Sequence, residues 1–190
     1  MIGEVNIMIS ARHIHITEES LKILFGHPLH VRNMLNQVGQ FATCEVVSLR
    51  CGDKQIDNVR IIGPVRKYNQ VEVSRSEARY LGIYPPCRRS GDLNGASYIE
   101  IVGPCGVVKG NFAVIANRHV HMNFLDAKKM NIKDKEILKL HINSVKKGVI
   151  DVEAKVSEDG YFEVHLDTDD ANAFLVDNFD KGVLYRWNLK

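Results

Sequence analysis

Apolar and polar residues alternate along most of this chain. The alternation is clearest in residues 45–50, 59–62, 98–102, 107–116, 136–142, 149–156 and 161–166. Because neighbouring side chains of a strand point to opposite faces, this period of two predicts strands with one buried face. Glycine, asparagine and aspartate separate the segments at intervals of about 8–12 residues, which is typical of antiparallel barrels and sandwiches. The pattern therefore predicts a mainly β protein.

Four short helices are predicted between the strands, over residues 18–25, 75–81, 124–130 and 169–175. Thr17 is placed to cap the first helix, and Gly26 follows its last turn. Ser74 and Glu77 have the spacing of a capping box at the start of the second helix, which Gly82 ends. Residues 84–95 contain two prolines and two glycines and are predicted to form a loop.

One short motif occurs twice in the sequence. Residues 9–16 read ISARHIHI and residues 115–122 read IANRHVHM, so both copies contain Arg-His-aliphatic-His-aliphatic. A predicted short helix follows each copy. The repetition indicates two related strand-to-helix corners, one in each of two barrels.

The composition narrows the class of protein. The chain has 190 residues, of which 45% are hydrophobic and 25% charged, and a formal net charge of only +2. This balance gives no reason to expect nucleic-acid binding. No apolar run reaches the roughly 18–20 residues of a membrane span, and no basic leader precedes the first strand. Four cysteines occur without any C-x-x-C pair, so we expect reduced thiols in a soluble, cytoplasmic protein.

The repeated motif supplies candidate metal ligands. In a strand, residues i and i+2 share a face, so His13 and His15 would project their imidazoles together, as would His119 and His121. A single His-x-His is more simply explained as two surface histidines. Two nearly identical copies favour a metal site instead, because imidazole nitrogens are common zinc ligands.

Two further residues would complete two three-ligand sites. His165 lies in an alternating segment, and Glu72 lies in the segment QVEVS at residues 70–74. Taken alone, His165 is equally explained as a hydrogen-bonded core or edge histidine, and Glu72 as a solvent-facing strand residue. Catalytic zinc commonly has three protein ligands and an open fourth position. The residues alone therefore predict a metal-dependent β protein and leave its reaction open.

Five segments together resemble the PduL-type phosphotransacylase (phosphate propanoyltransferase) family, which exchanges coenzyme A and phosphate on a short acyl group. They are ISARHIHIT, GPVRKYNQVEVSRSEARYLG, RSGDLNGA, VIANRHVHM and EVHLDTDDANAF, and they span residues 9–174. The resemblance implies a mainly β fold of two antiparallel β-barrels with short capping helices. One barrel would comprise residues 1–12 with 113–190, and the other residues 13–112.

The resemblance also implies the site residues. One of two zinc ions would be held by His13, His15 and His165, and the other by Glu72, His119 and His121. Arg66 would bind phosphate as the catalytic arginine. The positions that fall where the family contacts coenzyme A are Ile9, Ser10, Ala11, Arg60, Arg79 and Asn172.

The implied activity is that of a phosphate acyltransferase. It would convert acetyl-CoA or propanoyl-CoA and inorganic phosphate reversibly into acyl phosphate and coenzyme A. The partners would be these small molecules, with no nucleic acid or membrane, while a homo-oligomer and a link to propanediol degradation in bacterial microcompartments stay open. Two alternatives are a zinc-dependent thioester hydrolase, which would not need the phosphate fork of Arg66, and a non-catalytic acyl-CoA-binding protein with structural zinc.

Overall fold

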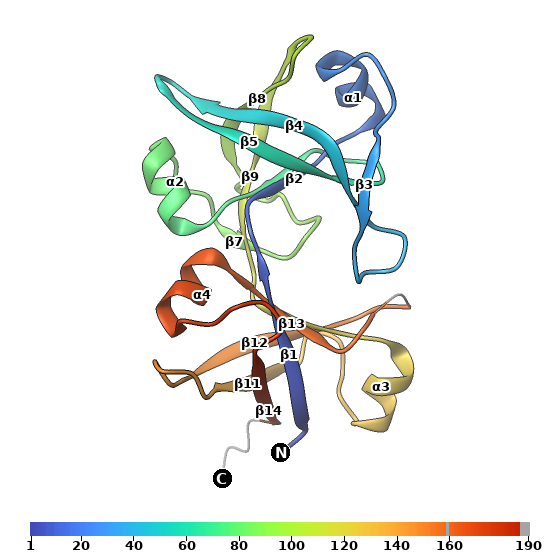
Figure 1. The fold of residues 1–190 in the computed structure, drawn as a ribbon, viewed down its shortest axis with the longest axis vertical. Helices are drawn as coiled ribbons and strands as arrows, with labels where there is room; N and C mark the ends of the chain where they lie inside the picture. The colour runs from blue at the N-terminus through green and yellow to red at the C-terminus, as the bar shows by residue number, and fades with distance from the viewer. Residues whose placement is uncertain (159, 187–190) are drawn as a thin grey trace. The chain divides into compact units, whose positions relative to one another are not determined.

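The alternating segments form strands that are joined by short helices, which the computed structural model describes over residues 1–158 and 160–186 (Figure 1). The first part of the chain contains β1 (Gly3–Ser10), β2 (His13–His15), α1 (Glu18–Leu24), β3 (Val31–Met34), β4 (Phe41–Cys51), β5 (Lys54–Gly63), β6 (Gln70–Glu72), α2 (Arg75–Leu81), β7 (Cys87–Arg88), β8 (Ser97–Val102) and β9 (Val107–Ala116). The second part contains β10 (His119–Met122), α3 (Phe124–Lys129), β11 (Ile137–Ile142), β12 (Gly148–Val156), β13 (Glu163–Asp167), α4 (Thr168–Phe174) and β14 (Lys181–Arg186).

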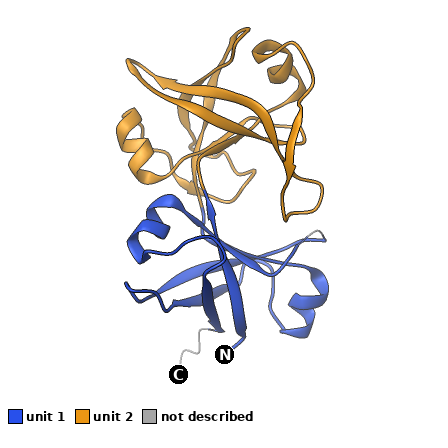
Figure 2. Ribbon diagram, viewed as in Figure 1, with its two compact units in different colours: residues 1–10, 117–190 blue, residues 11–116 orange. Residues whose placement is uncertain are grey.

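The chain divides into two compact units (Figure 2). Unit 1 consists of residues 1–10 and 117–190, and unit 2 consists of residues 11–116. The sequence had placed these boundaries at residues 12/13 and 112/113. In both divisions the N-terminal strand belongs with the C-terminal part of the chain.

Each unit contains a closed barrel of six strands. In unit 1 the order is β1-β13-β10-β12-β11-β14. In unit 2 the order β4-β5-β2-β6-β9 is closed by β8, which pairs with both β9 and β4. The prediction of a mainly β fold with two barrels and short helices is confirmed.

The sequence had suggested antiparallel barrels, but some neighbouring strands run parallel. In unit 2, β2 runs parallel to β5, and β6 runs parallel to β9. In unit 1, β10 runs parallel to β12, and β1 runs parallel to β13. Parallel neighbours require long crossover connections, and here helices and other strands separate the partners along the chain. Alternation reports which face is buried and carries no information on strand direction.

The two barrels have the same topology. Around the barrel of unit 2 the strands follow the order β2-β5-β4-β8-β9-β6, and around that of unit 1 the order β10-β12-β11-β14-β1-β13. Taken in these orders, parallel and antiparallel pairs occur at the same places in both barrels. By this correspondence β1–β8 form the first structural repeat and β9–β14 the second. The first strand of each repeat belongs to the other repeat's barrel: β1 pairs with β13 in unit 1, and β9 pairs with β6 in unit 2. The repeated motif therefore marks two structurally equivalent positions, at β2 and β10.

Inward-facing apolar side chains fill the barrels. In β11, for example, Leu138, Leu140 and Ile142 are buried, whereas Ile137 and His141 are exposed. Separate clusters of buried aliphatic residues form the core of each unit. The histidine strands follow the same rule, since Ile14 and Val120 between the paired histidines are fully buried.

The predicted helices all form, within a residue or two of the expected bounds. Thr17 caps α1, and Ser74 and Glu77 form the capping box of α2, which ends at Gly82 in the left-handed conformation. Residues 84–95 form a loop except for β7, whose two residues pair with β9. Among the described residues, no helix combines the length and the apolar character that a membrane span needs.

Substitution of Leu138 by alanine tests the barrel core. Leu138→Ala should lower the free energy of unfolding by about 2–5 kcal/mol, because it leaves a cavity at a fully buried position. The neighbouring Ile137 is 47% exposed, so Ile137→Ala should cost about 0.5 kcal/mol or less. Urea unfolding followed by circular dichroism measures both. Equal losses in the two variants would contradict the assigned inward face of β11.

Candidate functional site

The antiparallel pair β2/β6 brings four polar side chains of unit 2 onto one face. His13 lies opposite Glu72, and His15 lies opposite Gln70. Cross-strand neighbours of this kind have their Cβ atoms about 4.5–5.5 Å apart. We refer to these four positions as the unit 2 grid.

The pair β10/β13 forms the equivalent grid in unit 1. His119 lies opposite His165, and His121 lies opposite Glu163. The unit 1 grid has the same register as the unit 2 grid, so that Glu72 and His165 occupy corresponding corners.

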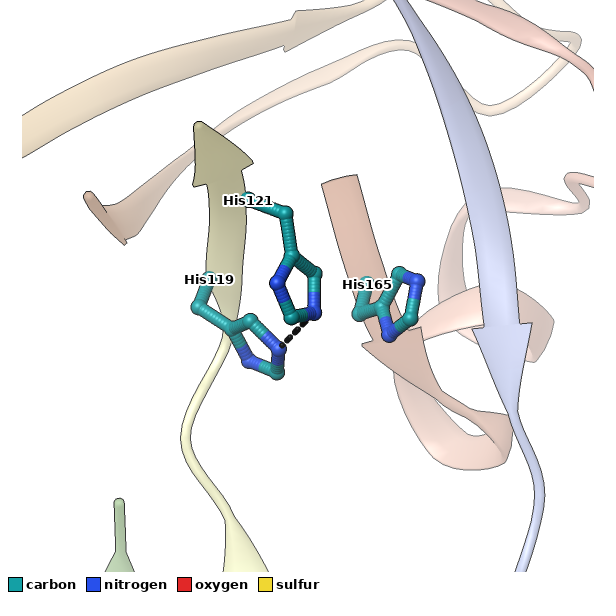
Figure 3. Close-up of side chains that lie close together, drawn as sticks. All are labelled: His119, His121 and His165. Atoms are coloured by element: carbon teal, nitrogen blue, oxygen red, sulfur yellow. Dashed lines mark hydrogen bonds between the residues drawn. The ribbon is translucent and has the colours of Figure 1, made fainter. Parts of the chain in front are cut away.

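Three corners of each grid converge. The ligand atoms of His13, His15 and Glu72 all lie within 4.8 Å of one another, and so do those of the three histidines of unit 1. Figure 3 shows the latter rings directed toward one another from β10 and β13, with the Nε2 atoms of His119 and His121 3.0 Å apart. Each convergent set has the size and chemistry of a three-ligand metal site.

The third member of each set differs from the sequence-based assignment. That assignment combined His165 with His13 and His15, and Glu72 with His119 and His121. In the structure, Glu72 and His165 each complete the set of their own unit. The exchanged grouping joins residues of different units, and it stays a prediction.

Backbone carbonyls orient the histidine rings. The Nδ1 atom of His13 lies 2.9 Å from the carbonyl oxygen of Ala11, and that of His119 lies 2.8 Å from the carbonyl oxygen of Asn117. The Nδ1 atom of His15 is 3.0 Å from the carbonyl oxygen of Ile62. A carbonyl only accepts, so the proton in these contacts lies on Nδ1, and Nε2 is the nitrogen of each ring that could bind a cation.

His121 is buried, and its surroundings keep its ring neutral. It is 1% exposed, its Nε2 meets the Nε2 of His119, and its Nδ1 has no hydrogen-bond partner within the described ranges. Burial, followed by the charges of His119, His165 and Lys155, holds the pKa of His121 far below its ordinary value. The ring therefore stays neutral, as a metal ligand must.

An arginine precedes each histidine pair and fixes it to a helix. Arg12 donates to Glu77 over 2.7 Å, and Arg118 donates to both carboxylate oxygens of Asp170 over 2.6 Å. Glu77 and Asp170 are the third residues of α2 and α4, which directly follow β6 and β13. These equivalent ion pairs join the first histidine strand of each grid to the strand that supplies its third corner.

A hydrogen-bonded chain connects Arg66 to the unit 2 grid. The Nη1 atom of Arg66 donates to the hydroxyls of Ser90 and Tyr68, over 3.1 and 3.2 Å. Buried Gln70 approaches the same Ser90 hydroxyl at 3.3 Å and donates to Glu72 over 2.6 Å. The predicted phosphate arginine is thus held in fixed relation to a predicted metal ligand.

The predicted coenzyme A positions are distributed over both units. Arg60 lies beside His13 in register, and its Nη1 donates to the carbonyl oxygen of Thr43 over 2.6 Å. Arg79 on α2 and Asn172 on α4 are exposed. Ile9 and Ser10 end β1 in unit 1, whereas Ala11 begins unit 2. Their assignment to coenzyme A stays a prediction.

A third cluster was not predicted from the sequence. His27, His30 and Glu45 also place ligand atoms within 4.8 Å of one another, with both histidines exposed. Here the ring and the backbone N–H of His30 both bind the carboxylate of Glu45. Burial favours a higher pKa for Glu45, but these bonds outweigh it and hold the pKa below its ordinary value. Hydrogen bonding therefore explains this cluster.

Sequence reasoning also missed Gln70 and Glu163, the fourth corners of the two grids. Both lie two residues before a third corner, on the same face of the strand. Once Glu72 and His165 are recognised as equivalent, this spacing identifies them.

Comparisons with known proteins identify the family of this chain. A family model described as phosphate propanoyltransferase matches residues 6–177. The phosphate propanoyltransferase of Thermotoga maritima is 44% identical over 177 residues, which cover 90% of this chain and 84% of that protein. Those of Salmonella typhimurium and Lachnoclostridium phytofermentans are each 39% identical, over 90% and 87% of this chain and 83% and 79% of the relatives. The chain belongs to the phosphate propanoyltransferase family, and with it to the acyltransferase enzymes.

Proposed function

We propose that the protein transfers a short acyl group between coenzyme A and inorganic phosphate, using two zinc ions. The observation that carries the proposal is the pair of equivalent grids, each with three convergent ligands on a strand pair of the same register. The names of the family and of its members support propanoyl as the acyl group, and acetyl is the shorter acyl group that we include in the proposal.

The donor atoms of each grid fit a zinc ion. His13, His15 and Glu72 would hold one ion, and His119, His121 and His165 the other. Imidazole nitrogen and carboxylate oxygen are ordinary zinc ligands, and three of them leave a position for an exchangeable ligand. When bound, zinc would supply Lewis-acid polarisation of the thioester carbonyl and stabilise the coenzyme A thiolate.

The protein groups keep the ligands in the required state. The carbonyl acceptors of His13, His15 and His119 hold the proton on Nδ1. The buried amide of Gln70 fixes the carboxylate of Glu72 by donating to one of its oxygens. Such partners reduce the reorganisation that binding would otherwise require.

Arg66 is suited to the phosphate. Its guanidinium stays charged at all relevant pH values and presents donors in a planar fork that matches phosphate oxygens. Tyr68 and Ser90 occupy Nη1, so the remaining nitrogens are available to an anion. In the reaction, a phosphate oxygen would form a bond to the acyl carbon while the carbon–sulfur bond breaks. Arg66 would offset repulsion between the two anionic substrates.

Metal analysis of single and double variants tests the ligand sets. His119→Ala should lower bound zinc by about one ion per chain, because two ligands hold a cation much less well than three. The double variant His119→Ala/His165→Ala should also lose about one ion, since both residues serve the same site.

The double variant distinguishes the two groupings. Loss of both ions would show that His165 serves the ion of His13 and His15, as the sequence-based assignment had it. His141→Ala, at an exposed position of β11, is the control and should keep the full zinc content. A wild-type protein without zinc would contradict the proposed function.

Substitution of Arg66 tests phosphate transfer. Arg66→Ala should keep its zinc and its fold but lose phosphate-dependent release of coenzyme A thiol from acetyl-CoA and propanoyl-CoA. Arg66→Lys should restore only part of the rate, because an ammonium group lacks the fork. Arg32→Ala, at an exposed position of β3, should leave turnover unchanged. Unchanged turnover in Arg66→Ala would remove this residue from the site, and thiol release without added phosphate would indicate a hydrolase.

A further inference from the structure

The fourth corner of each grid carries a different residue in the two barrels. It is Gln70 in unit 2 and Glu163 in unit 1, opposite the second histidine in both cases. Both side chains are buried, and both contact the third corner of their own grid.

The two pairs are chemically complementary. In unit 2 the third corner is the carboxylate of Glu72, and the fourth is an amide that donates to it. In unit 1 the third corner is His165, and the fourth is the carboxylate of Glu163, 3.1 Å from its Nε2. Each grid therefore contains one carboxylate, at the third corner in unit 2 and at the fourth corner in unit 1.

A cation in unit 1 would change the role of Glu163. A nitrogen that gives its lone pair to a metal has no proton to donate. With the Nε2 of His165 used in this way, the bond to Glu163 is lost, and a carboxylate with a 5% exposed side chain remains beside a dication. Opposite charges attract strongly in a site shielded from water, so a dication at this position would be stabilised by the negative charge of Glu163, which also hydrogen-bonds Tyr161.

Tyr161 contacts two histidines of the unit 1 grid. Its ring stacks on His121 at 5.0 Å with an interplanar angle of 11°, and its hydroxyl lies 3.1 Å from the Nε2 of His165. The Tyr161 hydroxyl also hydrogen-bonds the side chain of Glu163. A phenol hydroxyl can donate to a carboxylate, so Tyr161 connects Glu163 with His165 at this corner.

We propose that Glu163 is the carboxylate that balances the charge of the ion held by His119, His121 and His165. In this role it is the counterpart of Glu72, which acts as a direct ligand in unit 2. This inference rests on the proposed function, since it assumes that unit 1 holds a divalent ion.

Cobalt binding to the metal-free protein tests the proposal without reference to activity. Co²⁺ absorbs visible light when it is bound, and its spectrum reports the ligands. Glu163→Gln, which places an amide at this corner as in unit 2, should weaken one of the two Co²⁺ affinities by about 10- to 100-fold. The other affinity should be unchanged. Glu4→Gln, at an exposed position of β1 in the same barrel, is the matched control and should leave both affinities unchanged.

A second variant separates charge from folding. Glu163→Asp keeps the negative charge and should recover most of the lost affinity, and circular dichroism of the metal-free variants checks their fold. Wild-type Co²⁺ affinities in a folded Glu163→Gln protein would overturn the proposal, and so would Glu163→Asp binding as weakly as Glu163→Gln. Absence of metal binding by the wild type would instead overturn the proposed function.

Discussion

The cross-strand register of two short strand pairs is the constraint on which the site depends. Because side chains alternate with a period of two, a slip of one residue would turn Glu163 and His165 inward and Val164 outward. The core prevents this slip, since Val164 in β13 and Val120 in β10 are fully buried. The hydrophobic effect that stabilises each barrel thereby also holds the candidate metal ligands on one face.

Helix caps reinforce the register at the end of the third-corner strands. β6 leads into the Ser74 cap of α2, and β13 leads into the Asp167 cap of α4. Arg12 and Arg118 then connect the first turns of these helices back to the histidine strands. Local helix signals and the long-range pairing thus support the same geometry, which is how a short strand acquires a defined partner.

The sequence was sufficient for the local features and insufficient for the pairing between distant segments. Capping residues, strand faces and the paired histidines follow from spacing within a few residues, and all of these appear in the structure. Which strand lies beside β2 or β10 depends on contacts between segments far apart along the chain. For this reason the sequence-based assignment gave Glu72 and His165 to different partners from those the structure brings together. The repeat contained the missing signal, because each of these residues lies two positions before a helix cap and five before an acid that pairs with arginine.

The two barrels share one topology and exchange their first strands, but their grids differ in chemistry. Each barrel is built from both repeats, since β1 and β9 pair within the barrel of the other repeat. Neither repeat completes its barrel alone, and the two barrels share one topology although two corners of their grids differ. The third and fourth corners carry a carboxylate and an amide in unit 2, and an imidazole and a carboxylate in unit 1. One negative charge beside each histidine pair is the property that both arrangements share, and the proposed divalent cations would require this shared charge.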